Sequence, residues 1–110
     1  MKIYIAGPIT APTSGQRAIN VVKATDAGID MIKLGHTPFI PHLFVAADIQ
    51  AMVQGRPIRY EEWMELDDEW LGLCDALLYL APSPGADREL ARAQELGLTV
   101  FMSIAEVPHA

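Results

Sequence analysis

The sequence contains a single cysteine and no cluster of lysine or arginine side chains. One cysteine cannot form an internal disulfide, so the chain is expected in a reducing cytoplasm. Cys74 closes a predicted helix and is expected to be a buried, unreactive thiol. With a net charge of −6 and no clustered cations, the chain is not expected to bind a nucleic-acid polymer. This does not exclude a single nucleotide as a ligand.

Long hydrophobic runs are also missing. The longest apolar stretches, such as residues 76–82, fall far short of the roughly 20 residues that a membrane-spanning helix needs. Met1 leads directly into an apolar run without the charged region of a signal peptide. His36, His42 and His109 are widely separated in the sequence, so no metal site and no cofactor are expected. His36 and His109 are expected at the surface.

What is present is the composition of one globular domain spanning residues 1–110, with 51% hydrophobic and 20% charged residues. Short β-rich runs alternate with helical patterns. The predicted strands are residues 2–6, 37–40, 76–80 and 98–102, and the predicted helices are residues 16–34, 44–52, 60–74 and 86–96. The first helix has capping residues before it and Gly35 after it, with apolar residues at Ala18, Ile19, Val22, Ile29 and Ile32.

This alternation predicts a three-layer, doubly wound α/β fold of the flavodoxin or Rossmann-like type, with a parallel sheet of four to five strands. In such sheets ligands bind at the carboxyl ends of the strands. Those ends carry Gly7 and Pro8, Pro41 and His42, and the loop at residues 82–85. The three segments are therefore expected to meet at one rim.

Two carboxylates depart from the amphipathic pattern of their helices. At 100° per residue, one half of the 60–74 helix is apolar and the other half collects Glu61, Glu62, Glu65, Asp68 and Glu69. Asp67 falls inside the apolar arc. In the 86–96 helix, Glu89 lies among Ala86, Ala93 and Leu96, while Asp87, Arg88, Arg92, Gln94 and Glu95 take the polar side.

A carboxylate that faces a sheet is costly unless it is hydrogen-bonded or paired, and near a ligand rim its pKa can suit catalysis. A structural role, as a loop cap or a partner for arginine, is the alternative for each acid. Two such acids near one rim favour function. Glycosidic chemistry uses a pair of acids, one at the anomeric carbon and one at the leaving group or water.

Four segments, spread over nearly the whole chain, carry a family resemblance. They are residues 3–10 (Ile-Tyr-Ile-Ala-Gly-Pro-Ile-Thr), 39–42 (Phe-Ile-Pro-His), 67–71 (Asp-Asp-Glu-Trp-Leu) and 83–89 (Ser-Pro-Gly-Ala-Asp-Arg-Glu). They resemble the nucleoside 2-deoxyribosyltransferase superfamily, most closely its small members that hydrolyse N-glycosidic bonds of nucleotides. The resemblance implies cleavage or transfer at the N-glycosidic bond of a (deoxy)nucleoside or nucleoside 5′-monophosphate.

The resemblance also implies roles for single residues. It makes Glu89 the nucleophile and Asp67 the second catalytic acid, the same two carboxylates that break the helical pattern. Tyr4 is expected to contact the nucleophile, whereas a tyrosine packed in the core is the alternative. The expected substrate-binding residues are Gly7, Pro8, His42, Ser83 and Gly85, with His42 near the base.

Thr10 stands where the nucleotide hydrolases of this superfamily have an arginine for the 5′-phosphate. Arg17 could reach in from the first helix, although a solvated arginine is commoner. A non-catalytic nucleotide-binding module of the same fold is therefore the main alternative function. A phosphoribohydrolase of the lysine-decarboxylase-like family is disfavoured, because residues 83–89 have no Pro-Gly-Gly-x-Gly-Thr pattern. A flavodoxin-like electron carrier is disfavoured by the first loop, which lacks a phosphate-binding pattern.

The expected partners are a small nucleoside or nucleotide and further copies of the chain, with no membrane. A domain of this size is expected to form a homodimer or homotetramer. The apolar residues Trp63, Met64, Met52 and Val53 are the expected contacts.

Overall fold

The computed structural model describes residues 1–110, and strands alternate with helices along the chain as the sequence predicts. The strands are Lys2–Ala6 (β1), Thr37–Phe39 (β2), Ala76–Tyr79 (β3) and Thr99–Phe101 (β4). The helices are Ser14–Lys33 (α1), Val45–Val53 (α2), Tyr60–Gly72 (α3) and Pro84–Glu95 (α4). Two short 3₁₀ helices, Pro41–Phe44 (η1) and Ile104–Glu106 (η2), complete the chain.

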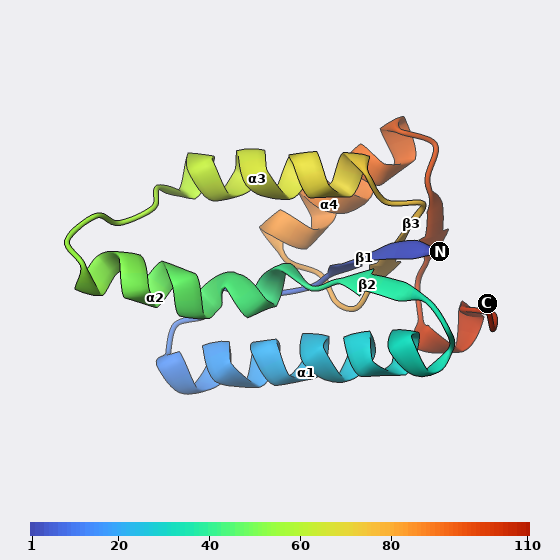
Figure 1. Cartoon of the computed structure of the whole chain (residues 1–110), viewed down its shortest axis with the longest axis horizontal. Helices are drawn as coiled ribbons and strands as arrows, with labels where there is room; N and C mark the ends of the chain where they lie inside the picture. Colours follow the sequence, from blue (N-terminus) through green and yellow to red (C-terminus); the bar gives the residue numbers. More distant parts are fainter.

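The four strands form one sheet in the order β2-β1-β3-β4, and all its neighbours are parallel. Helix α1 covers one face, whereas α3 and α4 cover the other (Figure 1). Crossovers of this kind place helices on both faces of a parallel sheet. The predicted three-layer α/β fold is therefore confirmed, with four strands.

Strand β1 lies in the interior of the sheet and is buried on both faces. Ile3 and Ile5 pack into the cluster under α1, while Tyr4 and Ala6 pack into the cluster under α3 and α4. A strand covered on both sides has an almost continuous apolar sequence, as this one has. The alternation of side chains along β1 thus points Tyr4 towards α3 and α4.

Helix α1 approaches the sheet through small residues. Ala24, Ala27 and Gly28 are buried on its inner side. A Cβ at Gly28 would clash with Cδ1 and Cγ1 of Ile40, so any larger residue here would force Ile40 to move. Met31 is fully buried there as well, but several other large apolar side chains of α1 point away from the sheet. Those of Ile19, Val22, Ile29 and Ile32 are exposed.

Gly28→Ala should lower the free energy of unfolding by about 1–3 kcal/mol, because the added methyl group overpacks the contact with Ile40. Gly15→Ala is the matched control. Gly15 lies in the same helix, but a Cβ there would meet no atom within 4 Å, so that substitution should be neutral or stabilising by up to about 1 kcal/mol. Urea denaturation of both variants measures the difference. Equal stability of the two would contradict the close packing of α1.

His36 is buried, so its expected surface position is wrong. Its Nδ1 lies 2.9 Å from the amino group of Met1, and its Nε2 lies 2.6 Å from the carbonyl oxygen of Pro108. The amide of Ala110 also donates to the carbonyl of Leu34, at 2.9 Å. These bonds hold both ends of the chain beside the turn that leads into β2, where Figure 1 shows the two termini close together.

Residues 40–59, between β2 and α3, form an arm that extends beyond the sheet (Figure 1). The helix predicted at residues 44–52 is α2, displaced by one residue, and a 3₁₀ turn that begins at Pro41 (η1) precedes it. Trp63 and Met64 on α3 are half-buried and line a cavity, and their contact with another copy stays a prediction. Met52 and Val53 on α2 are exposed.

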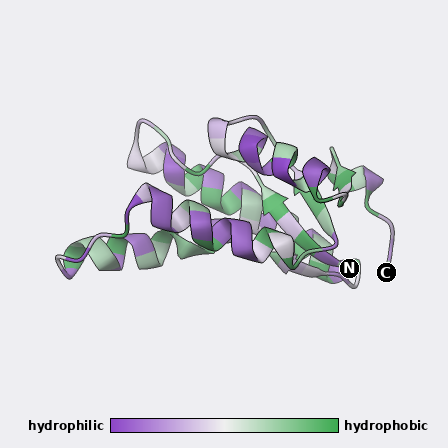
Figure 2. Cartoon of the chain, turned by 90° about the horizontal axis from the view of Figure 1, so that it is seen from above, coloured by the Kyte–Doolittle hydropathy of each residue, from purple (hydrophilic) through white to green (hydrophobic).

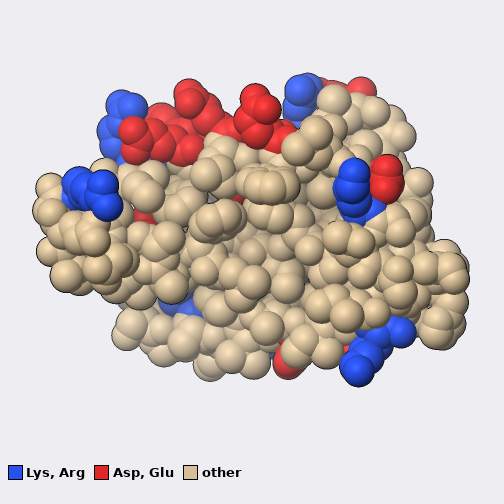
Figure 3. All heavy atoms as spheres, in the orientation of Figure 1, with Lys and Arg blue, Asp and Glu red and all other residues tan.

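The outer side of α3 is polar and acidic, whereas its inner side faces the sheet. Seen from the side of α3 and α4, hydrophilic residues occupy much of these helices (Figure 2). Acidic side chains gather over α3 (Figure 3), and Glu61, Glu62, Glu65 and Glu69 are exposed there as predicted. None of the helices has the length and hydrophobicity required to cross a membrane.

Candidate active site

A cavity of about 560 Å³ opens at the carboxyl edge of the sheet, between the ends of the strands and the arm. Five of the predicted site residues line it: Gly7, Asp67, Ser83, Gly85 and Glu89. The remaining wall includes Ile9, Thr10, Arg17, Pro41, Phe44, Val45, Asp48, Ile58, Tyr60, Trp63, Met64, Pro84, Ala86 and Arg88. Tyr4, Pro8 and His42 lie outside this wall.

The loop before α4 positions Glu89. Ser83 caps the helix, because its Oγ accepts from the amide of Ala86 at 3.0 Å, and Pro84 occupies the first turn. A Cβ at Gly85 would meet no protein atom within 4 Å, so this glycine borders open space on the cavity side. Glu89 follows in the second turn of the helix, and it is only 7% exposed.

Burial raises the pKa of Glu89 from 4.5 to about 7, because the ionised carboxylate loses its hydration. The hydrogen bond from the Tyr4 hydroxyl and the charge of Arg88 act in the opposite direction, while Asp67 and Asp68 raise the pKa further. Near neutral pH the side chain therefore exists in both protonation states. A carboxylate in this environment is weakly solvated, as a nucleophile or a general base requires.

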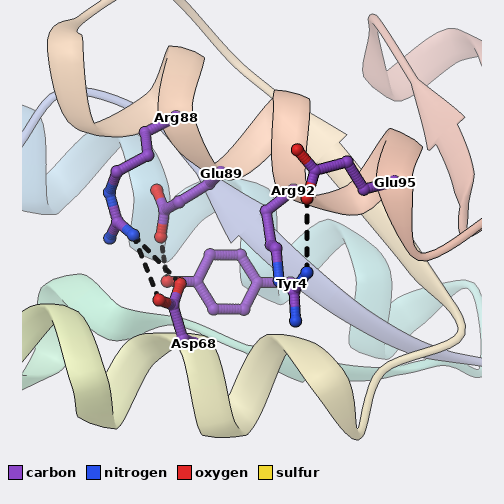
Figure 4. Close-up of polar contacts among 6 residues, drawn as sticks. All are labelled: Tyr4, Asp68, Arg88, Glu89, Arg92 and Glu95. Atoms are coloured by element: carbon purple, nitrogen blue, oxygen red, sulfur yellow. Dashed lines mark hydrogen bonds and ion pairs between the residues drawn. The ribbon is translucent and has the colours of Figure 1, made fainter.

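Tyr4 is fully buried and donates its hydroxyl hydrogen bond to Oε2 of Glu89 (Figure 4). Burial and the neighbouring Glu89 raise the pKa of this phenol, so it stays neutral and acts as a donor. Because the hydroxyl of Tyr4 donates to one oxygen of the Glu89 carboxylate, it restrains the direction in which the other oxygen points. The tyrosine is thus a core residue and also the hydrogen-bond partner of Glu89.

Asp67 lies on α3, lines the same cavity as Glu89, and is half-buried. Burial raises its pKa to about 6, with Arg88 opposing and Asp68 adding to the rise. Its Oδ1 is buried and has no hydrogen-bond partner in the protein. The departure of Asp67 from the helical pattern thus corresponds to a carboxylate that faces the cavity.

Arg88 and Asp68 form an ion pair that joins α4 to α3, with Nη1 at 3.1 and 3.2 Å from the two carboxylate oxygens (Figure 4). Helical periodicity assigns both residues to the solvated faces, so the sequence did not predict that they lie beside the site. Twenty residues separate them, and no local spacing indicates the pairing. Arg88 also lines the cavity, and its Nε is buried without a partner.

The structure places His42 differently from the expected contact with a base. The side chain is 1% exposed, and Nε2 lies 3.2 Å from the carbonyl oxygen of Gly7 and 3.1 Å from that of Pro8. Because both neighbours are acceptors, Nε2 carries the proton. Burial lowers the pKa of His42 despite these two bonds, so the imidazole is neutral. His42 therefore bonds to the turn after β1, through Gly7, which lines the cavity, and Pro8, which does not.

A second ion pair lines the cavity, between Arg17 and Asp48. The sequence pointed to Arg17 but not to Asp48. Arg17 on α1 donates to Asp48 on α2 at 2.9 Å, and the indole nitrogen of Trp63 donates to the other oxygen at 2.8 Å. These bonds, led by the one from Trp63, lower the pKa of Asp48. Arg17 therefore reaches the cavity, but its charge is balanced by an aspartate. No group of three His, Cys, Asp or Glu side chains is arranged to hold a metal ion.

Both the comparison with protein families and the comparison with solved structures find similar proteins. The profile of a family described as a domain of unknown function (DUF7768) matches residues 2–103. Among solved structures, the chain is similar to a 2-deoxyribosyltransferase from the psychrotolerant bacterium Bacillus psychrosaccharolyticus, with a TM-score of 0.54 and 24% sequence identity. The match covers 91% of this chain and 69% of that one, and it shows a shared fold. No curated protein matches in sequence.

Proposed function

We propose that this chain, which belongs to the DUF7768 family, cleaves or transfers the N-glycosidic bond of a nucleoside or nucleoside 5′-monophosphate, with Glu89 as the nucleophile. One observation carries the proposal. A buried carboxylate, oriented by the hydroxyl of Tyr4, faces a cavity whose wall holds a second unpaired carboxylate, Asp67.

The reaction needs two displacements at the anomeric carbon. In the first, an oxygen of ionised Glu89 attacks C1′, the bond from C1′ to the base nitrogen breaks, and the base leaves with its electron pair and takes a proton from water or from protonated Asp67. In the second, water or another base attacks C1′ and releases Glu89. Water gives hydrolysis and a second base gives transfer. Tyr4 keeps its proton throughout and holds the carboxylate in place.

The shared fold supports this chemistry, because the similar solved structure is named as a 2-deoxyribosyltransferase and described as a biocatalyst for nucleoside synthesis. The raised pKa values of Glu89 and Asp67 also fit, since perturbed acids cluster at catalytic sites. Two roles are open to Asp67, either protonation of the leaving base or positioning of the sugar. The paired state of Arg17 favours a neutral nucleoside over a 5′-phosphate, because Asp48 already balances its charge.

The test is incubation of the protein with purine and pyrimidine nucleosides and their 5′-monophosphates, with and without an added free base. Chromatography should show released base, or exchanged base when a second base is present. Binding of these compounds without any released or exchanged base would instead identify a non-catalytic nucleotide-binding module. A comparison of nucleosides with their monophosphates also tests the expected preference for the neutral substrates.

A further inference from the structure

Two residues in the wall of the cavity each have a buried polar atom without a partner in the protein. One atom is the donor Nε of Arg88 on α4, and the other is the acceptor Oδ1 of Asp67 on α3. The two side chains are close enough for the charge of Arg88 to lower the pKa of Asp67. Buried polar groups without a partner are costly, so a bound group is expected to satisfy both.

The opposite character of the two atoms limits what this group can be. The guanidinium can only donate and the ionised carboxylate can only accept, so the bound group must both accept and donate. A phosphate would meet the negative charge of Asp67, and an ammonium group could not accept from Arg88. A hydroxyl satisfies both atoms.

Asp68 holds the arginine in the orientation that this contact requires. Both oxygens of Asp68 accept from the same nitrogen, Nη1 of Arg88, which anchors the guanidinium to α3 and leaves Nε without a partner. Figure 4 shows Arg88 extending from α4 towards Asp68 beside Glu89. The pair also balances the arginine charge, which suits a neutral ligand.

The stereochemistry of a nucleoside identifies the hydroxyl. In a β-nucleoside the base lies on one face of the sugar, and the 2′- and 3′-hydroxyls lie on the other. Displacement of the base requires Glu89 to approach C1′ from the face opposite the base, which is the hydroxyl face. Groups beside Glu89 therefore meet hydroxyls rather than the base. The 2′-hydroxyl is on the carbon next to C1′.

We propose that Arg88 and Asp67 together bind the 2′-hydroxyl of the substrate sugar, so that the site prefers ribonucleosides to 2′-deoxynucleosides. This inference rests on the proposed function and selects the sugar-positioning role for Asp67. It is the reverse of the preference that the name of the similar solved structure would suggest. With a deoxynucleoside both buried atoms stay unpaired, which corresponds to a loss of about 10²–10⁴-fold in kcat/KM.

The test compares matched pairs, adenosine with 2′-deoxyadenosine and uridine with 2′-deoxyuridine, by rates of base release. The wild-type protein should favour each ribonucleoside by about 10²-fold or more, and Arg88→Met should bring the ratio close to one. Arg92→Met is the matched control, because Arg92 lies one turn later on α4 and pairs with Glu95 at an exposed position (Figure 4). It should leave the ratio unchanged.

A second arm separates this inference from the proposed function. Binding of the same pairs to Glu89→Gln, measured by calorimetry, needs no turnover. Tighter binding of the ribonucleoside, lost when Arg88→Met is added, supports the inference even if no base is released by the wild-type protein. Equal or tighter binding of the deoxynucleoside, or no binding of either, overturns it. If Arg88→Met fails to fold, Asp67→Asn serves as the second variant and should reduce the same ratio.

Discussion

Glu89→Gln is expected to lower the rate of base release by on the order of 10⁴-fold or more, because the amide cannot form the glycosyl intermediate. The fold should persist, since the amide oxygen can still accept the hydrogen bond from Tyr4. The measurement is single-turnover release of base from the best substrate found for the wild-type protein.

Glu95→Gln provides the control for this loss of activity. Glu95 is on the same helix but exposed, and it pairs only with Arg92, so its variant should keep the wild-type rate. Activity of Glu89→Gln within tenfold of the wild type would mean that another group attacks the sugar. Restoration of activity by a small external anion such as azide would support the assignment, because the anion can take the place of the missing carboxylate.

The same substitution is expected to stabilise the protein at alkaline pH. The pKa of Glu89 is about 7 in the folded protein against 4.5 when unperturbed, so the folded state binds the proton more tightly than the unfolded chain. Stability therefore falls as the pH rises from 4.5 through 7, and the loss is complete above the folded pKa. At about 1.4 kcal/mol per pKa unit, Glu89 destabilises the fold by on the order of 3 kcal/mol at pH 8.

Urea denaturation at pH 8 and at pH 4.5 tests this prediction. Glu89→Gln should be more stable than the wild type at pH 8, and the two should nearly converge at pH 4.5, where the side chain is protonated in the folded wild type and half protonated in its unfolded chain. Tyr4→Phe should have the opposite effect at pH 8, because it removes the hydrogen bond that favours the ionised carboxylate. A wild-type protein that is the more stable of the two at pH 8 would show that Glu89 is better solvated than its burial indicates.

The architecture could be predicted because its determinants are local. Apolar runs such as residues 2–6, the caps at Thr13 and Ser83, and the left-handed Gly35 and Gly97 define the elements within one or two residues. The inward position of Glu89 could be predicted for the same reason, since an acid in an apolar arc is visible from periodicity alone. Its catalytic role stays a prediction.

The ion pairs at the site could not be predicted, because each joins residues that are distant in the sequence. Asp68 and Arg88 both carry the periodicity of solvated faces, and only the packing of α3 on α4 brings them together. Asp48 meets Arg17 and Trp63 through the folding of the arm over α1. His42 follows the same rule, because its role depends on carbonyls 34 and 35 residues earlier.

The bonds of His36 to Met1 and Pro108 hold both termini at one end of the molecule, away from the cavity. Both termini lie at the amino edge of the parallel sheet, while the cavity opens at the carboxyl edge. A surface tether or fusion partner attached at Ala110 would therefore face away from arriving small molecules. The same proximity makes residues 110 and 1 a natural junction for a circularly permuted variant, with new ends in the exposed loop at residues 54–57.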